Sequence, residues 1–167
     1  MARDRPLPDR QTVWSWLAEI PDPEIPVISL VDLGIIREVA WQDDLLEVTV
    51  TPTYSGCPAT AVINLEIEQT LRAKGIEKLR LKRQLAPAWT TAWISEAGRQ
   101  KLRAYGIAPP QDGALCAGGL TETPTVVTCP HCGAEAGERV SQFGSTPCKA
   151  SYRCRSCLEP FDYFKPF

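Results

Sequence analysis

Apolar side chains recur at two different spacings along the first two thirds of the chain. Spacings of three or four positions, typical of amphipathic helices, occur in three segments: residues 11–20, 58–74 and 91–105. Alternation of apolar and polar positions, typical of half-buried strands, occurs in three others: residues 35–41, 45–51 and 79–85. In chain order these segments predict a small α-β-β-α-β-α domain of the α+β class.

The residues between these segments predict where the chain turns. Asp43 and Asp44 lie between the first two predicted strands, which indicates a hairpin. Gly75 follows the second predicted helix and marks its C-terminal end. The run from Asp22 to Pro26 cannot be helical, because its two prolines lack backbone donors and force the preceding residues into extended conformations.

Charge and glycine content divide the 167-residue chain into two modules. Residues 1–68 carry 4 basic and 12 acidic side chains, whereas residues 69–103 carry 9 basic and 2 acidic ones. Residues 106–124 hold four Gly and three Pro but no Lys or Arg, a composition typical of linkers. We therefore predict an α+β domain at 1–105, a linker at 106–124 and a second module at 125–167.

Composition excludes several classes of protein. The formal net charge is -2, so the chain lacks the excess of basic residues that neutralises phosphates, and we expect no nucleic-acid partner. No run reaches the roughly 20 apolar residues that a membrane helix needs. The charged, proline-rich start of the chain has no apolar stretch of a secretory signal behind it. We therefore expect a cytoplasmic protein without a membrane partner, and the sequence leaves a homo-oligomer open.

Two C-x-x-C motifs give the second module its chemistry. Cys129-Pro-His-Cys132 and Cys154-Arg-Ser-Cys157 are separated by 21 residues. Each motif brings two thiolates to one ion and two motifs complete a tetrahedron, so we predict a structural zinc site at these four cysteines. A module of about 43 residues builds little hydrophobic core, and a metal stabilises it instead. A rubredoxin-like iron site uses the same four thiolates and is the alternative.

Cys148 and His131 are the other candidate ligands of this module. We expect Cys148 to be a buried thiol, in the core or beside the metal, with replacement of one of the four ligands as the alternative. His131 lies inside the first C-x-x-C motif, and we expect it to face solvent rather than to bind metal. Because it is the single histidine of the chain, a Glu-x-x-His di-iron site is excluded.

The loop before the second predicted helix holds a further cysteine. In Gly56-Cys57-Pro58, proline favours the first helical position, which makes Cys57 the expected N-cap. A thiol there faces unpaired backbone N–H groups and the positive end of the helix dipole, which stabilise a thiolate. The alternative is a cap residue without chemistry. Asp22 and Glu24 either add oxygen ligands near this thiolate or form a solvated turn.

Several motifs resemble known families. The first module resembles the small iron–sulfur assembly domain shared by bacterial SufT-like proteins and eukaryotic cytosolic iron–sulfur targeting factors. The residues that carry this resemblance are Asp22-Pro-Glu-Ile-Pro26, Val31-Asp-Leu-Gly34, Thr51-Pro-Thr, Gly56-Cys57-Pro58 and the block from Trp89 to Arg99. With the second module included, the chain resembles the D components of bacterial phenylacetyl-CoA epoxidase systems, the PaaD or PaaJ proteins. The residues concerned are Phe143-Gly-Ser-Thr, Cys148-Lys, Tyr152-Arg-Cys154 and Cys157-Leu-Glu-Pro-Phe161.

The resemblance implies an accessory factor rather than an enzyme. Such a factor matures the iron or iron–sulfur centres of the epoxidase, with the di-iron oxygenase component or the iron–sulfur reductase as its partner. It implies that Cys57, with Asp22 and Glu24, transiently holds iron or an iron–sulfur cluster. The alternative is an electron-transfer or structural subunit that stays in the oxygenase complex.

Six basic side chains form a further candidate feature. We interpret them either as a docking surface for the partner or as ordinary solvated surface. They are Arg80, Lys82 and Arg83 of the third predicted strand and Arg99, Lys101 and Arg103 of the last predicted helix.

Overall fold

The computed structural model describes residues 6–54, 56–111 and 126–166. The chain folds into two compact units, a first unit of residues 1–89 and a second unit of residues 90–167. Both contain helix and strand, so the predicted α+β class is confirmed. Within the described residues, no helix is long and apolar enough to cross a membrane.

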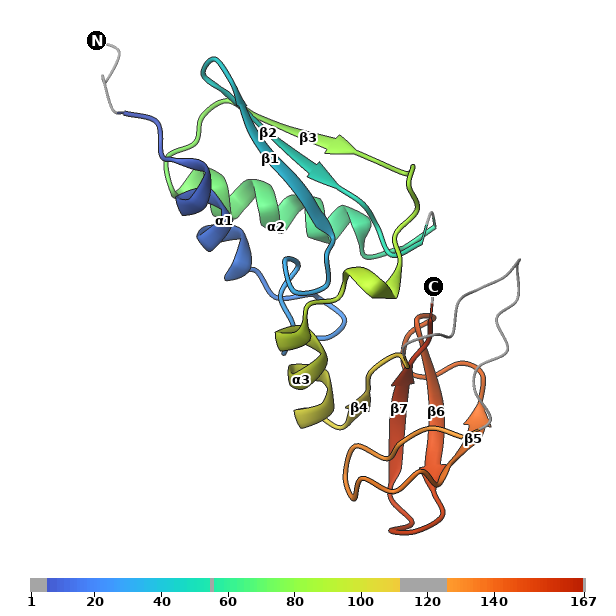
Figure 1. Ribbon diagram of the computed structural model, residues 1–167. Coiled ribbons are helices and arrows are strands. Elements are labelled where there is room, and N and C mark those ends of the chain that lie inside the picture. Colours follow the sequence, from blue (N-terminus) through green and yellow to red (C-terminus); the bar gives the residue numbers. More distant parts are fainter. Residues whose placement is uncertain (1–5, 55, 112–125, 167) are drawn as a thin grey trace. The chain divides into compact units, whose positions relative to one another are not determined.

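The first unit is a three-stranded sheet with two helices against it (Figure 1). Its elements are α1 (Arg10–Ala18), β1 (Ile36–Gln42), β2 (Leu45–Val50), α2 (Thr60–Ala73) and β3 (Leu79–Arg83). The strand order is β1-β2-β3, with β1 antiparallel and β3 parallel to β2. Every element begins and ends within two residues of the segment predicted for it, because periodicity and turn residues agree along this part of the chain.

Local chemistry sets the ends of these elements. Asp9 caps α1, with its Oδ1 accepting a 2.7 Å hydrogen bond from the backbone N–H of Thr12. Gly75 follows the end of α2 at φ 94°, a left-handed conformation that favours glycine. Asp43, at φ 54°, forms the predicted turn between β1 and β2.

The core of the first unit lies between one face of the sheet and the helices. Alternate strand residues point inward, as the pleat requires. The buried strand residues on this face are Val39, Leu46, Val48 and Val50. Helical residues spaced by four positions meet them, and these are Val13 and Leu17 of α1 with Ile63, Ile67 and Leu71 of α2.

The second unit joins a short helix to a four-stranded sheet. Its elements are the 3-10 turn η1 (Thr91–Trp93), α3 (Glu96–Ala104), β4 (Ile107–Ala108), β5 (Gly137–Ser141), β6 (Lys149–Cys154) and β7 (Pro160–Phe164). The strand order is β4-β7-β6-β5, in which β6 is antiparallel to both neighbours and β4 is parallel to β7.

The predicted helix at residues 91–105 is interrupted. Ser95 caps α3 by accepting a 2.9 Å hydrogen bond from Gly98 N–H, so η1 and α3 are separate elements. Ala97, expected to be buried, is exposed, whereas Gly98 and Leu102 are buried. A capping serine competes with the continuation of the preceding helical turn, which shifts the buried face.

The division at residue 89 differs from the predicted domain boundary at residue 105. The difference arises because α3 contacts β4, and β4, in the segment predicted as a linker, pairs with β7. Residues 112–124 of that segment lie outside the described residues. The boundaries 1–105, 106–124 and 125–167 therefore stay a prediction.

Candidate metal centre and cysteine loop

The four cysteines of the two C-x-x-C motifs meet at one end of the sheet of the second unit. Their Sγ atoms all lie within 4.8 Å of one another. The Sγ atoms of Cys129 and Cys157 are 3.8 Å apart and those of Cys132 and Cys154 are 3.6 Å apart. Four sulfurs bound to one zinc ion at about 2.3 Å are about 3.8 Å apart at tetrahedral angles. The donor set therefore fits a tetrahedral metal ion.

The two C-x-x-C turns share one backbone pattern. In the first turn, Gly133 N–H donates to the Cys129 carbonyl at 2.9 Å, and in the second Leu158 N–H donates to the Cys154 carbonyl at 3.0 Å. Gly133 has φ 77° and Leu158 has φ 65°, both in the left-handed region. The absence of a glycine after Cys157 therefore does not change the shape of the turn.

Backbone donors prepare one of the sulfurs for metal binding. The N–H groups of Cys157 and Ser156 donate to Cys154 Sγ at 3.5 and 3.3 Å. These bonds, that from Cys157 first, lower the pKa of the Cys154 thiol to about 6. Metal ions bind the thiolate rather than the thiol, so the turn favours the form that a metal requires.

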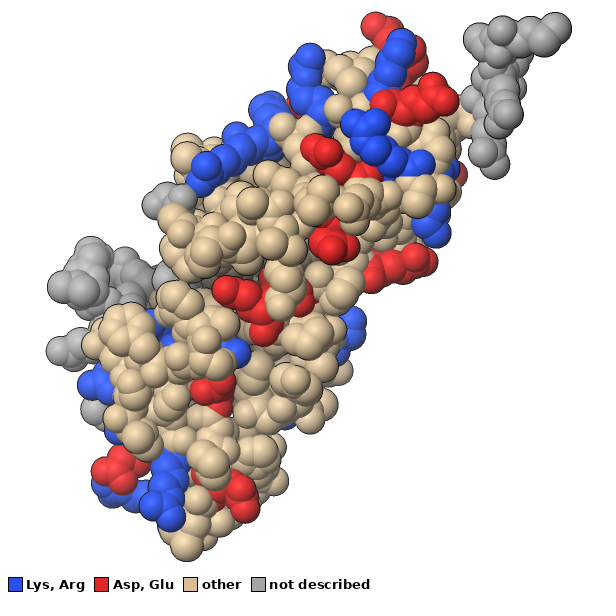
Figure 2. Space-filling model, turned by 180° about the vertical axis from the view of Figure 1, so that it is seen from behind, with Lys and Arg blue, Asp and Glu red and all other residues tan. Residues whose placement is uncertain are grey.

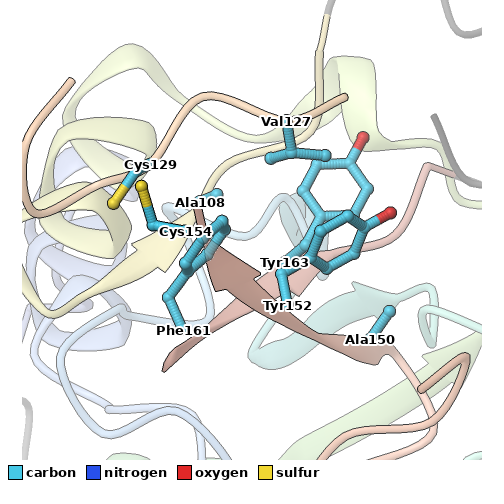
Figure 3. Packing of buried hydrophobic residues seen from close by; sticks show 8 residues of the cluster. All are labelled: Ala108, Val127, Cys129, Ala150, Tyr152, Cys154, Phe161 and Tyr163. Carbon is cyan, nitrogen blue, oxygen red and sulfur yellow. The ribbon is translucent and has the colours of Figure 1, made fainter. Parts of the chain in front are cut away.

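A small aromatic core supports the four cysteines (Figure 3). The Tyr152 ring stacks on Phe161 at 5.8 Å and meets Tyr163 edge to face at 5.5 Å. Cys129 and Cys154 belong to the same buried cluster, at the end beside Phe161 (Figure 3). The metal site is thus continuous with the hydrophobic core of its sheet.

Cys148 and His131 lie outside the group of four sulfurs. Cys148 is buried, and its Sγ lies 3.0 Å from the Thr146 hydroxyl. His131 is exposed and lies against Gly106, where an added Cβ would come within 3.1 Å of the imidazole. In the described part of the chain, neither residue forms part of a cluster of three or more metal-binding side chains.

The structure corrects the position expected for Cys57. The N-cap of α2 is Ala59, and Cys57 lies two residues earlier. The reason is an additional turn at Pro58 and Ala59, in which the Cys57 carbonyl accepts hydrogen bonds from Thr60 N–H at 3.2 Å and Thr60 Oγ1 at 2.8 Å. Cys57 itself is half-buried. Its sulfur is therefore held by a loop before the helix rather than by the helix cap.

The same loop begins with a residue for which the sequence indicated no separate role. Thr51 is 1% exposed, and its hydroxyl has no hydrogen-bond partner in the described part of the chain. Its N–H donates to the Ile35 carbonyl at 2.9 Å. Buried hydroxyls usually have a partner. The residue was visible only as part of the Thr51-Pro-Thr motif, because hydrogen bonding of a side chain cannot be read from its position in a motif.

Asp22 and Glu24 occupy a tight loop of the first unit. Asp22 is buried, and its Oδ1 accepts hydrogen bonds from the N–H groups of Glu24 at 2.9 Å and Ile25 at 2.8 Å. This carboxylate therefore shapes the loop. Among the described residues, Asp22, Glu24 and Cys57 are not part of a cluster of metal-binding side chains, and their joint role stays a prediction.

The six basic side chains of the predicted tract belong to two different units. Arg80 and Lys82 lie on β3, and both approach the carboxylate of Glu47, at 3.6 and 3.7 Å. Arg99, on α3, donates to the carbonyls of Thr91 and Pro110. Arg99 therefore ties loops of the second unit together, and only the β3 residues remain as one candidate docking surface.

Both units match described protein families. Residues 10–78 match the family "Iron-sulfur cluster assembly protein", and residues 116–165 match the "PaaD zinc beta ribbon domain". A crystal structure of a domain of unknown function from Bacillus anthracis has a TM-score of 0.51 at 21% identity, covering 55% of this chain and 89% of that chain. This likeness concerns the fold alone.

Two relatives extend the comparison. An Fe-S protein maturation auxiliary factor of Porphyromonas gingivalis is 30% identical over 98 residues, which cover 58% of this chain and 92% of the relative. The D component of the 1,2-phenylacetyl-CoA epoxidase of Escherichia coli is 46% identical over 158 residues, which cover 95% of this chain and 93% of the relative. The resemblance seen in the sequence is thereby confirmed, and the chain belongs to the family of phenylacetyl-CoA epoxidase D components, the PaaD proteins.

Proposed function

We propose that this protein is an accessory factor that matures the iron or iron–sulfur centres of a phenylacetyl-CoA epoxidase and is not itself a catalyst. The observation that carries the proposal is the union of two modules in one chain. An iron–sulfur assembly domain covers residues 10–78, and a ribbon of the PaaD type follows it. The partners are the di-iron oxygenase component or the iron–sulfur reductase of the epoxidase system.

The cargo site of this proposal is Cys57. A half-buried sulfur in a loop is reachable by a partner protein, yet partly shielded from water. A single soft ligand binds iron or an iron–sulfur cluster weakly, so the cargo passes on to a client with more ligands. Asp22 and Glu24 take part as oxygen ligands or by holding the neighbouring loop in shape. The chemistry is transfer of a metal species, with no bond of an organic substrate broken here.

The four cysteines of the second unit have a structural role in this proposal. We assign zinc to them, because the sulfur separations of 3.6 and 3.8 Å fit a tetrahedral ion and the buried cluster behind them is small. When bound, zinc supplies a rigid cross-link between the two turns. Iron fits the same four thiolates, and a rubredoxin-like site would make the protein an electron-transfer subunit that stays in the oxygenase complex.

The test of the cargo site is Cys57→Ser, co-expressed with the epoxidase components. We expect an intact fold but an epoxidase that accumulates with deficient iron and low activity. The measurement is the iron content and turnover of the purified epoxidase. Cys116→Ser makes the same chemical change at a cysteine without an assigned role and serves as the control. A fully metallated, active epoxidase from Cys57→Ser cells would show that Cys57 carries no cargo.

A second measurement separates a maturation factor from a permanent subunit. Epoxidase produced without this protein is incubated with the purified protein, iron and a sulfide source, and the protein is then removed by affinity tag. A maturation factor leaves activity behind after its removal. If activity disappears whenever the protein is withdrawn and returns on its addition, the alternative of a permanent subunit is correct.

A further inference from the structure

β3 is the edge strand of the sheet in the first unit. Within the described residues it pairs only with β2 (Figure 1). The N–H of Leu46 donates to the Lys78 carbonyl, and Gln84 N–H donates to the Val50 carbonyl, so the even-numbered residues of this strand face β2. Backbone groups alternate between the two sides of a strand. The N–H and C=O groups of Leu79 and Leu81 therefore point away from the sheet.

The two faces of this edge differ in chemistry. Leu79 and Leu81 pair in register with buried residues of β2 and are themselves only half-buried, on the face that carries the core. Arg80 and Lys82 lie on the opposite face, with 59% and 56% of their side chains exposed. Figure 2 shows basic side chains gathered along one edge of the first unit.

The inner neighbour of β3 shows what this strand accepts beside it. β2 pairs Leu46, Glu47 and Val48 with residues 79–81 of β3, so an acidic residue lies between two apolar ones. The carboxylate of Glu47 lies 3.6 Å from Arg80 and 3.7 Å from Lys82. Two cations thus share one carboxylate on the inner side, which leaves an excess of positive charge toward the open edge.

We propose that the β3 edge binds an extended segment of a partner protein in which acidic and apolar residues alternate. The segment adds a fourth strand to the sheet through the outward backbone groups of Leu79 and Leu81. Its acidic side chains lie beside Arg80 and Lys82, and its apolar side chains cover Leu79 and Leu81. The polarity of the two faces selects this alternation whichever way the segment runs.

The same charges make a second copy of this chain a poor occupant. Pairing two β3 edges would place Arg80 and Lys82 of each copy beside those of the other, and like charges opposite one another destabilise a sheet. The edge is therefore protected against pairing with itself and open to an acidic strand. This selectivity separates a docking edge from one that is only kept soluble by charge.

The test uses a blocked eight-residue peptide of alternating Glu and Val, labelled with a fluorophore, and the full-length protein. We expect saturable binding by fluorescence anisotropy. We also expect slower hydrogen exchange at the N–H groups of Leu79 and Leu81 when the peptide is present. A peptide with Lys in place of Glu, and one N-methylated at alternate amides, should both lose binding. Equal binding of either, or unchanged exchange at Leu79 and Leu81, overturns the proposal.

Variants of the protein test the charged face. Arg80→Glu with Lys82→Glu should weaken peptide binding by about tenfold, because two cross-strand attractions become repulsions. Arg103→Glu with Lys101→Glu makes the same change of charge on α3 and should leave binding unchanged. Equal effects of the two double variants would show a general charge effect and overturn the assignment to β3. The peptide comparison on the unmodified protein decides the question even if a variant folds poorly.

Discussion

Gly133 and Leu158 follow the last cysteine of the first and second C-x-x-C turns, and both have positive φ. For an L-residue with a side chain, the left-handed region costs about 1–2 kcal/mol, a cost that glycine avoids. Leu158 is 61% exposed, so its side chain gains little from burial in return. The requirement of the turn, rather than packing, therefore sets the energetics at both positions.

This requirement gives a reciprocal pair of predictions for the metal-loaded protein. An added Cβ at Gly133 would meet no atom within 4 Å, so Gly133→Ala should cost about 1 kcal/mol of unfolding free energy through its backbone alone. Leu158→Gly should gain about 0.5 kcal/mol, because relief of the left-handed cost exceeds the entropy of the added glycine. Hydrogen exchange of β6 amides measures both changes. A loss of stability in Leu158→Gly would show that its side chain packs favourably.

The residues differ in how far their roles follow from the sequence. The four cysteines are predictable, because a C-x-x-C turn is local and its spacing alone brings two sulfurs together. Cys57 is not at the predicted N-cap, since the first turn depends on the Thr60 hydroxyl bonding back to the Cys57 carbonyl. Asp22 shapes its own loop through two backbone N–H groups, a role that competes with ligand chemistry and that composition does not reveal.

At the scale of elements, periodicity works best where one face of an element is buried. The five elements of the first unit have such faces and follow the prediction closely. β4 has only two residues, too few for a periodic pattern, and it lies in a segment whose composition indicates a linker. The break between η1 and α3 was missed because a serine inside a helical pattern also occurs without capping.

The cap of α3 provides a prediction at this scale. Ser95→Ala removes the acceptor for Gly98 N–H and should cost about 1 kcal/mol of unfolding free energy. Ser95→Asp keeps an acceptor and adds negative charge at the positive end of the helix, so it should remain near the stability of the unmodified protein. Urea titration followed by circular dichroism measures both variants. If Ser95→Asp loses as much as Ser95→Ala, capping is not what Ser95 contributes.

At the scale of the whole molecule, the two units depend on different sources of stability. The first unit buries a core between helices and sheet, whereas the second builds a small aromatic cluster around four cysteines. Metal binding in small zinc modules contributes on the order of 10–16 kcal/mol, which exceeds what such a cluster supplies. The second unit should therefore need its metal, while the first should not.

Removal of the metal tests both this dependence and the domain boundary. A chelator, or Cys154→Ser, should abolish hydrogen-exchange protection in β5, β6 and β7 and leave α1, α2 and the first sheet protected. Cys148→Ser, at a cysteine outside the group of four sulfurs, should keep its metal. Full metal content in Cys154→Ser with loss in Cys148→Ser would show that Cys148 is the fourth ligand.

The behaviour of α3 in the same experiment decides which boundary is correct. α3 contacts β4, and β4 pairs with Asp162 and Tyr163 of β7, so collapse of the ribbon removes the support of the helix. Nine residues are too few for a stable isolated helix. We therefore expect α3 to lose protection together with β7. Protection of α3 that persists with that of α2 would instead place the boundary at residue 105, as the sequence predicts.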